Sequence, residues 1–173
     1  MFSLNDKVVY PGYGVGIICK IFTRTISGNQ VTFFEIKFQN KDMTAMVPRD
    51  RIEAVGIRPL STVHYINDML NTIIQPVKPA KTENTGSNWN KRNKEYQSKL
   101  NTGSLKDISE IYRDLKWVSR TKELSFGEKN LLIKAEALLA QEISAAQHVD
   151  EDKALQSLRR LFPISGGVYI QQL

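Results

Sequence analysis

Short apolar runs separated by turn residues dominate the first third of the chain. Residues 32–38 alternate Thr, Phe, Phe, Glu, Ile, Lys and Phe, and such alternation is typical of a strand with one buried face. Four such runs predict strands: Lys7–Tyr10, Val15–Phe22, Thr32–Phe38 and Met43–Val47. Turn residues separate them or end the last one: Pro11–Gly14, Ser27–Asn29, Asn40–Asp42 and Pro48. Short strands with tight turns over about fifty residues predict a small, strongly bent sheet or barrel.

From about residue 61 the apolar positions follow the period of a helix. Val63, Ile66, Met69 and Ile73 form the first stripe. Each helix that we predict has a polar residue suited to cap its start, and the expected caps are Ser61, Asn88, Ser104, Ser125 and Asp150. Ser125 and Glu128 form a capping box, and Pro163 ends the last helix.

The break between the two patterns predicts the domain organisation. Residues 75–86 contain two prolines and few apolar side chains, as expected of a linker. The predicted fold class is therefore α+β, with a small bent sheet followed by an all-α helical bundle. The expected divisions are a β domain (1–60), a connecting helix (61–75), a linker (76–87), the helical domain (88–162) and a tail (163–173).

Positive charge is concentrated around Trp89. The net charge is +6, and residues 76–100 hold six Lys and Arg against two Asp and Glu. Lys91, Arg92 and Lys94 follow the indole closely, which suits a surface that neutralises phosphates and offers an apolar wedge to bases. The alternative stays open that Trp89 covers the end of a helical bundle while its neighbours are solvated.

Enzyme chemistry is not visible in the sequence. His64 and His148 stand apart from any catalytic partner, and the single cysteine, Cys19, lies in an apolar run, so we expect it to be a small core residue. The glycines at positions 12, 14 and 16 lack the Lys-Ser/Thr pair and the helix of a phosphate-binding loop. We therefore expect no enzyme, no cofactor and no bound metal.

The compartment follows from what the chain lacks. One cysteine allows no internal disulfide, no apolar run reaches the length of a membrane span, and the first residues do not form a secretory signal. These features predict a cytoplasmic protein without a membrane partner.

Several ordered motifs resemble the CarD/CdnL family of bacterial transcription regulators. They extend over residues 2–160 and comprise Phe2-x-Leu4-x-Asp6-x-Val8-Val9-Tyr10-Pro11-x-x-Gly14, Thr23-Arg24-Thr25-Ile26-x-Gly28, Thr44-x-x-Val47-Pro48, Val55-Gly56-Ile57-Arg58, Asn88-Trp89-x-x-Arg92-x-Lys94, Tyr112-Arg113-Asp114-Leu115 and Leu124-Ser125-x-Gly127-Glu128-Lys129-x-x-Leu132-x-Lys134-Ala135. The first block is shared with the polymerase-interacting module of transcription-repair coupling factors. The Asn-Trp and Leu-Ser-x-Gly-Glu-Lys blocks are typical of the full two-domain family.

The resemblance implies a role for each domain. A Tudor-like (SH3-like) β domain would dock on the β subunit of bacterial RNA polymerase, through positions matching Arg24, Thr25, Ile26, Met46 and Pro48. Met46 departs from the family, in which this position can be Arg, so either docking is less electrostatic and weaker or the polymerase surface differs in compensation.

The helical domain of the family meets promoter DNA at the upstream fork of the melted region. Trp89 matches the residue that wedges there, and Lys91, Arg92 and Lys94 match the basic positions around it. The resemblance thus implies a monomer that associates with the nucleoid through RNA polymerase and stabilises the open complex. A protein–protein adaptor with no direct DNA role is the alternative that the residues leave open.

Overall fold

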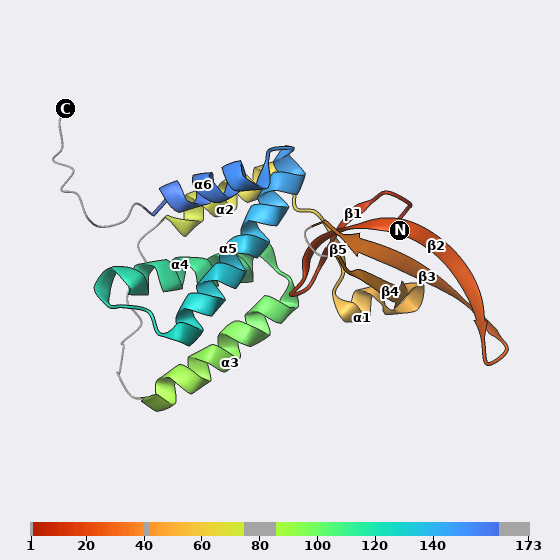
Figure 1. Ribbon diagram of the computed structural model, residues 1–173, viewed down its shortest axis with the longest axis horizontal. Helices are drawn as coiled ribbons and strands as arrows, with labels where there is room; N and C mark the ends of the chain where they lie inside the picture. Colours follow the sequence, from red (N-terminus) through yellow and green to blue (C-terminus); the bar gives the residue numbers. More distant parts are fainter. Residues whose placement is uncertain (1, 40–41, 75–85, 163–173) are drawn as a thin grey trace.

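The computed structural model describes residues 2–39, 42–74 and 86–162, with side chains of the last range from residue 91 onward (Figure 1). An antiparallel five-stranded sheet precedes a group of helices, which confirms the predicted α+β class. The strands are β1 (Lys7–Tyr10), β2 (Gly14–Ile26), β3 (Asn29–Phe38), β4 (Thr44–Pro48) and β5 (Arg58–Pro59), in the spatial order β4-β3-β2-β1-β5. Of the predicted turn at residues 40–42, positions 40 and 41 lie outside the described residues.

The β2–β3 hairpin is longer than the apolar pattern predicts. Its pairing continues through polar positions to Ile26 and Asn29, and the two strands project beyond the rest of the sheet (Figure 1). Ser27 and Gly28 join them with φ angles of 49° and 84°. Two consecutive positive φ angles match the strand twist in a two-residue hairpin, so the turn itself favours this extended ribbon.

Cys19 is exposed, so the expectation of a core cysteine is wrong. The register shifts between Ile18 and Lys20, which leaves Cys19 as the extra residue of a β-bulge. Its thiol donates to the carbonyl oxygen of Glu35 at 3.3 Å. Partial burial and the Glu35 carboxylate raise the pKa of this thiol, which favours its neutral, donating form.

Both faces of β1 are covered, which explains its two adjacent valines. Val8 belongs to the core of the β domain, whereas Val9 packs on the opposite side of the strand with Val15 and Ala145. A short 3-10 turn, Arg49–Arg51, and helix α1 (Ile52–Val55) close this core before β5. Neither these elements nor β5 was expected from the sequence, because each is too short to show a period. The main core residues of the β domain are Val8, Ile18, Phe34, Ile36, Phe38, Val47, Ile52 and Ile57.

The helices follow the expected order, with two changes at their starts. They are α2 (Val63–Ile73), α3 (Gly86–Thr102), α4 (Leu105–Thr121), α5 (Phe126–Gln147) and α6 (Glu151–Arg160). The caps expected at Ser104, Ser125 and Asp150 are confirmed, including the capping box. Thr62, not Ser61, caps α2, and α3 begins at Gly86, so Asn88 lies inside the helix rather than at its cap. Pro163 lies outside the described residues.

One apolar core joins helices α2 to α6. Ile66, Met69 and Ile73 of α2 pack in the same cluster as Leu100 of α3 and Leu139 of α5. Helix α2, expected to be a connection, therefore contributes directly to the packing of the helical domain. Helix α5 runs through this domain and reaches the sheet at its C-terminal end (Figure 1).

Candidate protein and nucleic-acid interfaces

The β2–β3 hairpin and β4 together present one exposed face, here called the hairpin face. The bulge at Cys19 changes the alternation of β2, so that residues 20, 22, 24 and 26 share a side. Cross-strand register adds residues 29, 31, 33 and 35 from β3, and Met46 and Pro48 from β4. The hairpin face therefore consists of Lys20, Phe22, Arg24, Ile26, Asn29, Val31, Phe33, Glu35, Met46 and Pro48.

This face combines the cations Lys20 and Arg24 and the carboxylate of Glu35 with apolar groups. The Phe22 and Phe33 rings stack with centroids 5.7 Å apart, and the Arg24 guanidinium lies 4.9 Å from the Phe22 centroid. Ile26 and Met46 are 48% and 57% exposed, which leaves apolar surface for a partner. Of the residues predicted to contact polymerase, the sheet brings Arg24, Ile26, Met46 and Pro48 together. Thr25 alternates to the other side of the ribbon.

The N-terminal half of α3 carries the residues predicted to contact DNA. Trp89 lies in its first turn, and its side chain lies outside the described part. Lys91 and Lys94 are exposed and stand three residues apart, on one side of the helix. They are available to a polyanion.

Arg92 is placed differently from these lysines. Its Nη2 lies 4.0 Å from Oε1 of Glu128, which is the capping-box residue of α5, and only 34% of its side chain is exposed. Lys122 Nζ reaches the same carboxylate oxygen at 3.3 Å. Arg92 therefore joins the start of α5 to α3, and Glu128 offsets part of its charge.

The Glu128 carboxylate holds this junction together. Its Oε2 accepts a hydrogen bond of 2.8 Å from the Ser125 backbone, and Ser125 Oγ accepts from the Glu128 backbone at 3.3 Å. Burial opposes the charge, but hydrogen bonds from Ser125 and Lys122 outweigh it and lower the pKa of Glu128. Sequence reasoning recognised this cap but not its second role as the partner of Lys122 and Arg92.

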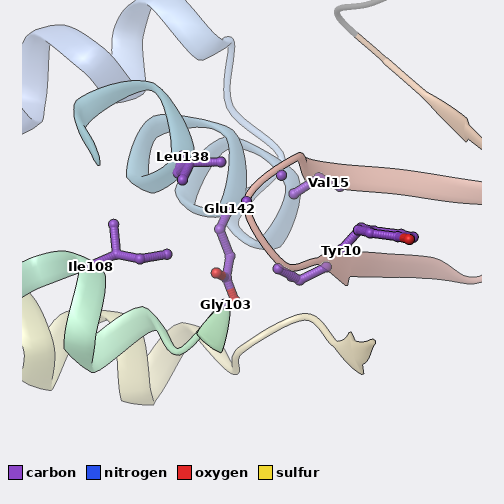
Figure 2. A pocket seen from close by; sticks show the side chains of 9 residues that line it. Tyr10, Val15, Gly103, Ile108, Leu138 and Glu142 are labelled. Atoms are coloured by element: carbon purple, nitrogen blue, oxygen red, sulfur yellow. The ribbon is translucent and has the colours of Figure 1, made fainter. Parts of the chain in front are cut away.

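An ion pair between a buried carboxylate and a partly buried guanidinium connects the two domains. Arg58, from β5, donates to both carboxylate oxygens of Glu142 on α5, at 2.7 and 2.8 Å. The same guanidinium donates to the Gly103 carbonyl oxygen at 3.0 and 2.7 Å, and the Ser61 backbone N–H donates to Glu142 at 2.9 Å. Figure 2 shows the Glu142 side chain reaching from α5 toward Gly103.

The backbone of the β1–β2 turn also lies directly against α5. The Val15 N–H donates to Gln141 Oε1 at 3.3 Å, and a Cβ on Gly14 would overlap the Gln141 side chain. The cavity beside these groups measures only about 10 Å³ and is bordered by Tyr10, Val15 and Leu138, among others (Figure 2). At most one water fits there, so the contact is a packed interface rather than a ligand site.

Sequence reasoning did not identify this interface. Arg58 lies within a family motif, but nothing local indicates its partner. The usable signal was Glu142, a charged residue between apolar positions of a long helix, because a buried charge requires a partner. Within the described ranges, no three His, Cys, Asp or Glu side chains gather as a metal site, and no helix there combines the length and apolar content of a membrane span.

Comparisons with known proteins agree with this two-part arrangement. Residues 2–61 match the family model of the CarD-like/TRCF RID domain, and residues 73–159 match that of the CarD C-terminal domain. The chain therefore has an N-terminal RID-type domain and a C-terminal CarD-type domain, and it belongs to the CarD-like family of transcription factors. It is similar to the protein named "Putative transcription factor YdeB" of Bacillus subtilis (strain 168), with 27% identity over 151 residues, covering 87% of this chain and 95% of the relative.

Proposed function

We propose that this protein docks on the β subunit of bacterial RNA polymerase and stabilises the open promoter complex. The observation that carries the proposal is the presence of two exposed surfaces on domains joined by a packed interface. The hairpin face offers Arg24, Ile26 and Met46 to a protein, and α3 offers Lys91 and Lys94 to DNA. The family membership supports polymerase as the protein partner.

The action on DNA would be a shift in the balance between melted and closed promoter states. A protein that binds only the melted geometry favours it by its differential affinity. Unstacking a base step costs a few kcal/mol, so the fork, where stacking is already broken, is the cheapest place to insert the Trp89 indole. Stacking contributes roughly 1–3 kcal/mol, which would slow bubble collapse by about tenfold to a hundredfold.

Docking makes a weak DNA contact sufficient. Attachment to polymerase raises the local concentration of the helical domain at the fork, so α3 needs little affinity for DNA by itself. Lys91 and Lys94 add salt-sensitive attraction without reading bases. In this role the protein acts as a cytoplasmic monomer, and promoters with the least stable open complexes respond most.

The test compares two variants by open-complex half-life with purified polymerase. Trp89→Ala removes the wedge and should abolish most of the lifetime gain while leaving polymerase affinity unchanged. Trp89→Phe keeps a smaller ring and should retain part of the gain. A Trp89→Ala protein that extends the half-life as fully as the wild type would contradict the wedge.

Arg24→Glu tests the docking surface separately. Reversing this charge at the hairpin face should weaken binding to the polymerase β subunit, measured by interferometry. The Arg24→Glu protein should still extend the open-complex half-life at high protein concentration, because its Trp89 is intact. Unchanged affinity would remove Arg24 from the interface.

A protein–protein adaptor without a DNA role is the second candidate. The exposed apolar groups of the hairpin face favour it, since they suit protein docking by themselves. An adaptor would bind polymerase normally, and open-complex lifetime would be unaffected by Trp89→Ala or by neutral replacements of Lys91 and Lys94.

A further inference from the structure

We infer that Arg58 and Glu142 are positioning residues, which lock the two domains in the one orientation that lets both surfaces engage at once. This inference rests on the proposed function and names a further requirement of it. The hairpin face and the first half of α3 belong to different domains, so a fixed spacing between them needs a stiff connection. The direct contact between β5 and α5, centred on Arg58 and Glu142, can supply that stiffness.

The geometry of the pair is selective for orientation. Only 2% of the Glu142 side chain is exposed, and the Arg58 guanidinium donates one hydrogen bond to each of its carboxylate oxygens. Paired hydrogen bonds of this type fix direction as well as distance. Removing the Glu142 charge from water offsets much of what the pair gains, although 26% of the Arg58 side chain stays exposed, so its placement here is better explained by specificity of geometry.

Each domain supplies some of the hydrogen-bond donors or acceptors of this contact. Arg58 and Ser61 come from the segment that leaves the sheet, whereas Glu142 and the Gly103 carbonyl come from the helical domain. The hydrogen bonds from Arg58 to Glu142 and Gly103, and the one from Ser61 to Glu142, form only when β5, α5 and the α3–α4 junction meet. A hinge motion between the domains would leave the buried Glu142 charge without its partner, which is strongly unfavourable.

The chain contains a matched control for this pair. Glu136 lies on the same helix α5, is nearly as buried, and accepts two hydrogen bonds from Arg159 at 3.1 and 2.8 Å. Both partners belong to the helical domain. Glu136→Gln and Glu142→Gln therefore remove the same charge from the same helix, but only the second acts on the contact between domains.

The first measurement follows domain orientation without polymerase or DNA. Nitroxide labels are attached to the native, exposed Cys19 and to a second cysteine from Ile133→Cys, which replaces a 63% exposed residue of α5. Double electron–electron resonance should give one narrow distribution of the distance between the two nitroxides. Glu142→Gln should broaden it, and Glu136→Gln should not. An unchanged distribution in Glu142→Gln would overturn the lock.

The second measurement links the lock to activity. With unlabelled proteins, Glu142→Gln should lose most of the gain in open-complex half-life while its affinity for isolated polymerase stays at the wild-type value. Glu136→Gln should keep both. If Glu142→Gln loosens the domains yet keeps the full lifetime gain, the positioning role is wrong.

Failure of the proposed function would look different. In that case the wild-type protein itself would not extend the half-life, although the distance measurement would still report the lock. Arg58→Lys serves as a second variant should Glu142→Gln fail to fold. Lysine keeps the positive charge but cannot donate the paired hydrogen bonds of a guanidinium, so this variant should also broaden the distance distribution.

Discussion

At the scale of single residues, neighbouring cations on α3 have different surroundings. Lys91 and Lys94 are exposed, whereas Arg92 is drawn toward Glu128. A phosphate contact requires an available charge, because binding is driven largely by release of counterions from the nucleic acid. The two lysines should therefore account for more of the salt dependence than the arginine between them.

Replacing both lysines tests this division. Lys91→Gln with Lys94→Gln should reduce the slope of log affinity for forked DNA against log salt by about 2, one for each phosphate that is no longer neutralised. Fluorescence anisotropy over a salt series measures the slope. Lys153→Gln on α6, an exposed lysine of another helix, is the control for removal of charge alone. An unchanged slope in the double variant would exclude these lysines from the DNA contact.

Cys19 is a second residue whose role depends on its surroundings. Because the bulge exposes it, Cys19→Ser should change the free energy of unfolding by no more than about 0.5 kcal/mol. Its neighbour Ile18 is 1% exposed, and Ile18→Ala should cost about 2–5 kcal/mol. Urea unfolding measures both. A serine variant as unstable as the Ile18 variant would show that position 19 is packed in the core.

The accuracy of prediction from sequence depends on how local each signal is. The caps at Ser104, Ser125 and Asp150 involve residues two or three positions away, so the local pattern suffices to predict them. The bulge at Cys19 depends on where β3 pairs, and one extra residue reverses every side chain that follows. The motif could therefore predict which residues contact a partner. It could not predict that most of them share one side of the hairpin, or that Thr25 lies on the other side.

At the scale of elements, the start of α5 combines a helix cap with a link to α3. Its carboxylate, Glu128, has a lowered pKa, so the folded protein releases this proton more readily than the unfolded chain. The resulting stabilisation is complete above the ordinary value of 4.5 and is lost as pH falls through the lower folded-state pKa.

Glu128→Gln tests this junction. The amide keeps part of the cap but leaves Lys122 and Arg92 without a counter-charge, so stability at pH 7 should fall by about 1–3 kcal/mol. Below the folded-state pKa, where the wild-type carboxylate is also neutral, the difference between the proteins should shrink. Thermal unfolding from pH 7 to pH 3 measures it. A difference that stays constant or grows toward acid would contradict a lowered pKa for Glu128.

At the scale of the whole molecule, the close approach of the β1–β2 turn to α5 complements the Arg58–Glu142 pair. Gly14 has φ of 96°, and a methyl group there would displace Gln141, which accepts from the Val15 N–H. Gly28, at the hairpin tip, has φ of 84° but nothing within 4 Å of an added Cβ. The two glycines thus share a left-handed backbone and differ in whether another domain lies against them.

Gly28→Ala should therefore cost about 1–2 kcal/mol, the local penalty of a left-handed alanine. Gly14→Ala should cost more than this, because the added Cβ drives the flexible Gln141 side chain away from the turn and removes its hydrogen bond with the Val15 N–H. Urea unfolding measures both energies. Gln141→Ala is the control, since it removes the same hydrogen bond without strain in the turn. If Gly14→Ala and Gly28→Ala lose equal stability, the contact of the β1–β2 turn with Gln141 contributes nothing to joining the domains.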